Sequence, residues 1–180
     1  MFSVFKQGRK VTLDYLTFWF VFVFFLPAVI ALGKDNFVKW IPFYSFLVGS
    51  LMCLVIWTDV YEFAIKEKRP IYNLSPSPYK GLLIGLLGFF PYYILSAAAN
   101  IFGSMAAEKF DFTQELVYVI NNMFLAPVFF VTRLLGGGAA AYVITYIFIP
   151  ALCFAAYFSG NKGYTKRKIV DRIKKRFTTQ

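Results

Sequence analysis

The sequence contains no histidine and only two cysteines among its 180 residues. Without histidine, the chain lacks the side chain most used for acid–base catalysis near neutral pH and the commonest metal ligand. Cys53 and Cys153 lie inside apolar runs without zinc-site or disulfide-framework spacing, so we interpret them as small buried hydrophobes. No serine or cysteine has a base beside it that would activate a nucleophile. The sequence therefore predicts neither a metal nor a cofactor, and nothing in it argues for an enzyme.

Acidic residues are also scarce, and the charges are segregated. Nineteen Lys and Arg oppose nine Asp and Glu, which gives a net charge of +10. Most basic residues flank apolar runs, and eight of them follow Asn161. Basic residues that border membrane spans are typical of topology signals and of attraction to anionic lipid, and we favour this interpretation over nucleic-acid binding. Membrane lipids are thus expected partners, and no nucleic acid is expected.

The chain contains several long apolar runs. It is 59% hydrophobic, with 23 Phe and 12 Tyr, and several runs reach the roughly 20 residues that cross a bilayer as a helix. We expect an all-α integral membrane protein with a helical membrane domain over 1–163 and a basic tail over 164–180. The first run is too long for the apolar part of a signal peptide, so it is interpreted as a retained span. The five apolar segments are 14–33, 41–65, 80–103, 114–135 and 139–158.

The basic residues between these segments alternate in number. Going along the chain, three precede the first segment, then two, four and one lie between successive segments, where the four include Lys80 at the start of the third segment, and eight form the tail. Because Lys and Arg near span ends favour the cytoplasm, this pattern predicts four crossings with both termini cytoplasmic. The alternative, five crossings, places either three or eight basic residues outside. We therefore expect a multi-pass protein of the cytoplasmic membrane.

We expect the segment 114–135 not to cross the bilayer. It contains Asn121, Asn122, Pro127 and Arg133, and an arginine at a helix centre costs about 2.5–3.5 kcal/mol on insertion scales. We predict an interfacial or re-entrant helix, followed by a tight glycine turn at 136–138 on the outer side.

The third segment carries small residues at alternating steps of three and four, so they share one helical face. In lipid such a face lets two helices approach closely. The predicted packing face consists of Gly81, Gly85, Gly88, Ser96, Ala99 and Gly103, with Tyr92 among them.

Asp59 and Glu62 form a candidate polar or ion site. Three residues apart, they share a helical face inside the second segment, and acidic groups at membrane depth by default mark function. The functional interpretation is a proton or cation site facing the bundle, which Ser50 and Thr58 would support. The structural interpretation, which we favour, places both acids at the cytoplasmic headgroup level and pairs them with Lys66 or a tail residue.

A second candidate cluster consists of polar residues expected on the outer side of the membrane, namely Asn100, Asn121, Asn122 and Arg133. As a site it would be a vestibule for an anionic substrate or lipid headgroup, with Arg133 as the anion partner. In the structural interpretation, which we favour, the asparagines would cap helices or form hydrogen bonds between helices, while Arg133 reaches the membrane interface.

The tail predicts a basic amphipathic helix. Ile169, Val170, Ile173 and Phe177 fall on one face, and such a helix suits an anionic cytoplasmic leaflet. The lipid-binding residues are Lys166, Arg167, Lys168, Arg172, Lys174, Lys175 and Arg176.

Two stretches, 149–164 and 80–87, resemble uncharacterised small membrane proteins of clostridial-type Gram-positive bacteria. The first reads IPALCFAAYFSGNKGY and the second KGLLIGLL. In those proteins a span that contains proline often leads through a Gly-Tyr-like turn into a basic tail. This chain departs in having Phe158-Ser159 before Gly160. The resemblance implies membrane location and transfers no residue role.

Three functions stay open from the sequence. The first is a non-enzymatic membrane subunit that packs against another membrane protein or a second copy, as an accessory or assembly partner of a larger complex. The second is a small channel or transporter with a polar path through Asp59, Glu62, Asn121, Asn122 and Arg133. The third and weakest is a membrane enzyme that acts on lipid.

Overall fold

The computed structural model describes residues 2–33, 37–68, 77, 79–107 and 122–162, and apart from short turns this part of the chain is helical. Four of the described helices are long and apolar enough to cross a membrane, as the sequence predicts. These are α1 (Phe2–Gly33), α2 (Phe37–Glu67), α3 (Lys80–Ala107) and α6 (Ala139–Lys162). The short helices η3 (Ala126–Val128) and α5 (Phe129–Leu134) precede α6.

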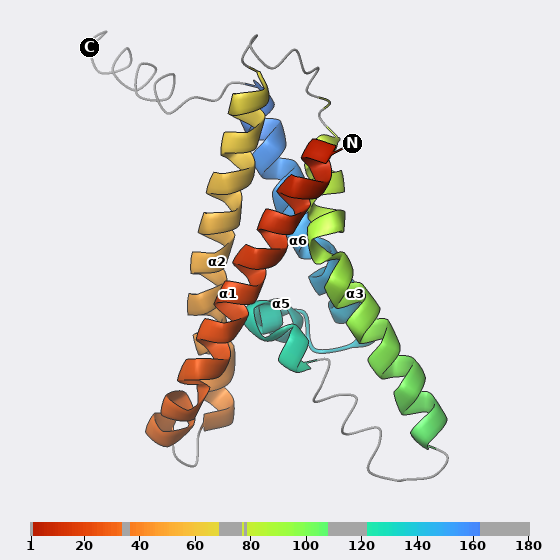
Figure 1. Ribbon diagram of the computed structural model, residues 1–180. Helices are drawn as coiled ribbons and strands as arrows, with labels where there is room; N and C mark the ends of the chain where they lie inside the picture. The colour runs from red at the N-terminus through yellow and green to blue at the C-terminus, as the bar shows by residue number, and fades with distance from the viewer. Residues whose placement is uncertain (1, 34–36, 69–76, 78, 108–121, 163–180) are drawn as a thin grey trace, which may run out of the picture.

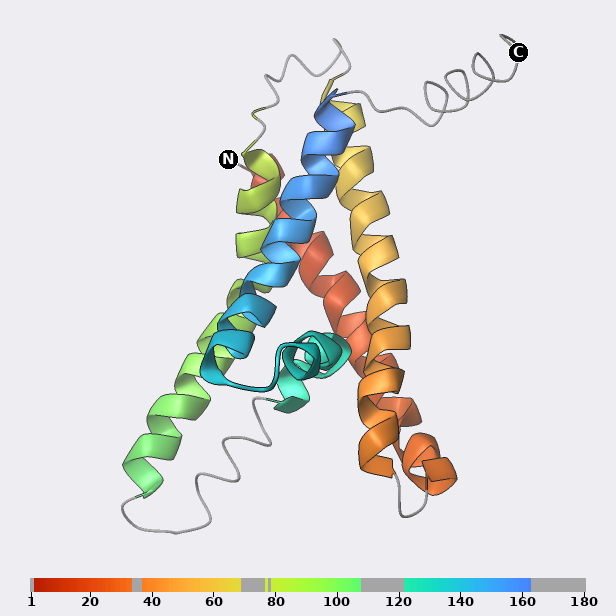
Figure 2. The same ribbon diagram turned by 180° about the vertical axis from the view of Figure 1, so that it is seen from behind.

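The four long helices run up and down (Figure 1). The beginnings of α1 and α3 and the ends of α2 and α6 gather at one end of the bundle, which we call the basic end. Away from it, the pair α1 and α2 diverges from the pair α3 and α6, as Figure 2 shows from behind. The short helices η3 and α5 lie between the two pairs.

The first helix begins at Phe2, twelve residues before the span expected over 14–33, and both end at Gly33. Its early turns are held by packing, because Val11 is buried and the Thr12 hydroxyl donates to the Gly88 carbonyl of α3 at 2.7 Å. The basic side chains Arg9 and Lys10 lie on the exposed face of these turns, where charge is tolerated.

Glycines allow the helices to cross closely, and the predicted face of α3 is used within this chain. A Cβ on Gly85 would lie 2.6 Å from the Cα of Pro150 in α6, and one on Gly88 would lie 2.8 Å from the Cβ of Val11 in α1. Gly81 likewise meets α6 at Tyr157. These backbones therefore touch across helix pairs, as close packing in lipid requires.

Other members of the predicted face behave in different ways. Ser96 is buried and accepts a hydrogen bond from the Tyr146 hydroxyl of α6, and Tyr92 is also buried. Ala99 and Gly103 belong to α3, but their side-chain surroundings lie outside the described part of the chain.

Helix α5 is six residues long and lies across the direction of the long helices (Figure 1). Side chains of α1 and α2 bond the backbone just before it. Ser45 donates to the Ala126 carbonyl at 2.7 Å and accepts from the Phe130 amide at 3.1 Å, and the Tyr15 hydroxyl donates to the Phe124 carbonyl at 2.8 Å. This irregular backbone is thereby satisfied inside the bundle. Of the segment predicted over 114–135, only 122–135 is described.

The turn after α5 is a glycine-dependent helix end. The Gly136 amide donates to the Arg133 carbonyl at 3.2 Å, and the Gly137 amide donates to the Thr132 carbonyl at 2.9 Å. This is the Schellman pattern, which requires a positive φ, and Gly136 has φ 86°. The predicted tight turn between two helices is confirmed.

Candidate functional site

The basic end contains a buried carboxylate that contacts all three other long helices. Glu67 closes α2, and its side chain is 6% exposed. Its Oε1 accepts from Lys80 Nζ of α3 at 2.5 Å and from Gln7 Nε2 of α1 at 2.6 Å. Its Oε2 accepts from the Tyr157 hydroxyl of α6 at 2.6 Å. We call these four residues the Glu67 cluster.

The Glu67 cluster can hold a charge in a low-dielectric interior because each carboxylate oxygen has a donor. A buried carboxylate is costly unless it is paired and hydrogen-bonded, and the Lys80 ammonium, itself 13% exposed, supplies the opposite charge. The arrangement joins four helices at one point, and this makes it a structural clamp.

Sequence reasoning missed Glu67 because it follows the second apolar segment, 41–65, and stands among the charged residues Lys66 and Lys68. The periodicity of α2 contained the signal. The buried residues of α2 that lead to it recur every three or four positions, namely Met52, Ile56, Val60, Ala64 and Glu67. Glu67 therefore continues the apolar face instead of joining the exposed charges beside it.

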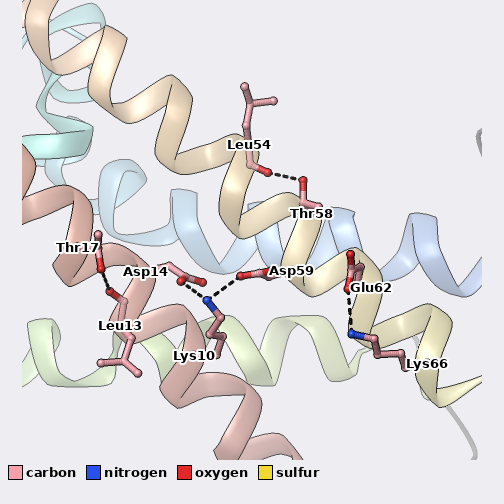
Figure 3. A network of polar contacts seen from close by, with 9 residues as sticks. All are labelled: Lys10, Leu13, Asp14, Thr17, Leu54, Thr58, Asp59, Glu62 and Lys66. Carbon is pink, nitrogen blue, oxygen red and sulfur yellow. Dashed lines mark hydrogen bonds and ion pairs between the residues drawn. The ribbon is translucent and has the colours of Figure 1, made fainter.

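A second ionic group, the Lys10 triad, lies where α1 and α2 meet (Figure 3). Lys10 Nζ is 2.7 Å from Asp14 Oδ1 and 3.1 Å from Asp59 Oδ2. The Asp14 side chain is 8% exposed and that of Asp59 is 28% exposed. One ammonium thus serves two carboxylates, the more buried of which comes from α1.

Asp14 was also missed, because the first span was expected to begin there. Once the helix starts at Phe2, Asp14 falls beside Tyr15 on the face that also buries Val11. The signal in the sequence was an acidic residue directly before Tyr15, on the face of α1 that is otherwise apolar.

The predicted pair Asp59 and Glu62 does not act together. Glu62 is 53% exposed and binds Lys66 at 2.9 Å, one turn along α2, whereas Asp59 binds Lys10 of α1. Figure 3 shows the two acids turned to different lysines. The pairing of Glu62 with Lys66 follows the structural interpretation made from the sequence. Thr58 does not join Asp59, since its hydroxyl donates to the Leu54 carbonyl.

The predicted outer polar cluster is only partly described. Asn122 accepts a hydrogen bond from the Tyr142 hydroxyl of α6 at 2.8 Å. Arg133 is exposed, and its guanidinium carbon lies 5.4 Å from the centre of the Phe129 ring. The Asn100 side chain, Asn121 and the tail residues lie outside the described part.

Comparisons of this chain with protein-family models, with curated proteins and with solved structures give no match. We therefore infer the function from the sequence, from the geometry of the two ionic groups and from the helix surfaces.

Proposed function

We propose that this chain is a four-span protein of a bacterial cytoplasmic membrane whose basic end faces the cytoplasm. The support is charge asymmetry, because Lys and Arg favour the cytoplasmic side of span ends. In the described residues the first turns of α1 carry three basic residues, whereas the opposite end of the α1–α2 pair carries Lys39. The basic residues at the basic end are Lys6, Arg9, Lys10, Lys66, Lys68, Lys80 and Lys162.

In this arrangement α5 is a re-entrant segment that enters from the outer side and does not cross. Non-helical backbone is tolerated at membrane depth only where protein or water satisfies it. The hydrogen bonds that Ser45 and Tyr15 make with the backbone around η3 meet this requirement. Arg133, at the exposed end of α5, would reach outer lipid phosphates.

Within the membrane the chain acts as a non-enzymatic subunit that binds another helical membrane protein through α1. The observation that carries this proposal is the exposure of α1. Only 11% of its most apolar window is buried within the bundle, against 39% for α3 and for α6. The exposed side carries large aromatic side chains, of which Phe20, Phe24 and Phe25 are at least half exposed.

These aromatic rings are ordered against one another, which suits a protein interface. Trp19 packs edge-on against Phe20, and Phe24 packs edge-on against Phe25, with ring centroids 5.3 and 5.1 Å apart. Rigid aromatic side chains bury large areas with little loss of rotamer entropy, and they are enriched in interface hot spots.

A photo-crosslinking residue at Phe24 tests the subunit proposal in native membranes. We expect an adduct of discrete size with another membrane protein, while the same residue at Leu83, an exposed position of α3, reacts with lipid alone. An adduct with a second copy would identify the complex as a homo-oligomer. Lipid adducts alone at both positions would contradict the proposal.

The channel or transporter alternative requires one path that joins the two predicted polar groups. Asp59, Glu62, Asn122 and Arg133 instead each have a separate local partner. No observation in the described residues favours that function over the subunit.

A further inference from the structure

The Lys10 triad places a buried carboxyl, that of Asp14, beside a second and partly exposed carboxyl, that of Asp59. Two carboxylates face one ammonium, so with all three groups ionised the net charge is −1. Asp14 is 8% exposed, and an uncompensated charge in such surroundings is strongly disfavoured. We propose that the triad is a proton-binding site, in which one exchangeable proton on Asp14 bridges to Asp59 while Lys10 neutralises the remaining carboxylate.

A separate observation at Asp14 points to this ligand. Its Oδ1 accepts from Lys10, but its buried Oδ2 has no hydrogen-bond partner among the described residues. The carboxyls of Asp14 and Asp59 both contact the Lys10 ammonium, at 2.7 and 3.1 Å, so they lie side by side (Figure 3). A proton on Asp14 turns the unsatisfied acceptor into a donor, and Asp59 accepts it.

The charged groups that the neighbouring helices contribute favour a proton over a metal ion as the ligand of the triad. Lys10 comes from α1 itself and Asp59 from α2, and the only charged residue of α6, Lys162, lies over the Phe158 ring. The only charged residue of α3, Lys80, is bound to Glu67. A metal ion would need several oxygen ligands, and the Lys10 ammonium already lies against both carboxylates.

The triad exchanges its proton through one side. Lys10 is 49% exposed and Asp59 is 28% exposed, whereas Asp14 adjoins the fully buried Val11 and Tyr15. Proton exchange therefore occurs at the surface that Lys10 and Asp59 share. Because the triad lies between α1 and α2, loss of the proton adds repulsion between these helices and loosens their contact. This inference does not depend on the identity of any partner of α1.

Infrared spectroscopy of the purified full-length protein in lipid vesicles tests the proton directly. A protonated carboxyl has a C=O band that a carboxylate lacks, and the band shifts in D₂O when its proton exchanges. We expect the wild type to show this band and Asp14→Asn to lose it, with the amide replacing the protonated acid as donor to Asp59. Glu62→Gln, which changes an exposed acid of α2, should keep the band.

Thermal unfolding over a range of pH supplies a second measurement. The wild type should unfold at lower temperature as the pH rises and the triad loses its proton, whereas Asp14→Asn should show a smaller dependence. Asp59→Asn leaves Lys10 and Asp14 as a one-to-one ion pair, so it should also lose the band if Asp14→Asn fails to fold. A wild type without the band, or a band that survives both substitutions, would overturn the proposal.

Discussion

At the scale of single residues, the ionic groups of this chain differ in what their removal would cost. Glu67 and Lys80 are both largely buried, so removing either charge would leave the other buried without this ion pair. Glu62 and Lys66 are each more than half exposed, and water screens their interaction. Two acids only five residues apart in α2 therefore have very different energetic roles.

Replacement of Glu67 by Gln tests this difference. The shape is preserved but the charge is lost, so the buried ion pair with Lys80 is broken, which costs about 3 kcal/mol or more. We expect a clear fall in the thermal unfolding temperature in detergent. Glu62→Gln is the matched control and should cost less than about 1 kcal/mol. Equal effects of the two substitutions would show that Glu67 is not a clamp.

At the scale of elements, glycines decide how closely the helices cross. Gly85 lies against Pro150 and Gly88 lies against Val11, so α3 contacts α6 and α1 on adjoining parts of its surface. Because these contacts involve backbone atoms of the neighbouring helix, a larger side chain would require the helices to move apart.

Substitution of Gly85 by Leu should separate α3 from α6. Replacing a helical glycine gains up to about 1 kcal/mol in helix propensity, but forcing extra atoms into a packed contact costs about 1–3 kcal/mol or more. We expect a net loss in thermal stability, measured by unfolding in detergent. Ala97→Leu adds bulk to an exposed position of the same helix and should have little effect. Unchanged stability of the Gly85 variant would refute the packing contact.

Local pattern in the sequence predicted the four long helices but not what each of them packs against. Apolar length predicted the four long helices, and 3–4 spacing predicted the glycine face of α3, because both depend on local pattern. The same spacing cannot reveal whether that face meets another chain or α6 and α1 of its own. Asp14 and Glu67 were missed for a related reason. Each adjoins charges or a presumed helix end in sequence, and only long-range packing shows that it is buried.

At the scale of the whole molecule, the charge pattern and the fold agree on one feature. The described basic residues of α1, the end of α2 and the start of α3 gather at the same end of the bundle as Lys162 of α6. The up-and-down order of the four long helices brings these four positions together. The clamp at Glu67 lies at this end as well, so the sites that join the helices coincide with the side proposed to face the cytoplasm.

Cysteine labelling in intact cells decides the topology. On a background that lacks Cys53 and Cys153, single cysteines at Ser3 and Thr179 should react with a membrane-impermeant reagent only after the membrane is permeabilised. Lys39→Cys, an exposed position at the start of α2, should react without permeabilisation and serves as the outer control. If 114–135 crossed the bilayer, the two termini would lie on opposite sides, and one of the two cysteines would be labelled from outside. Either three or eight basic residues would then be external, against the strong bias of Lys and Arg toward the cytoplasm, and the re-entrant assignment of α5 would fall with it.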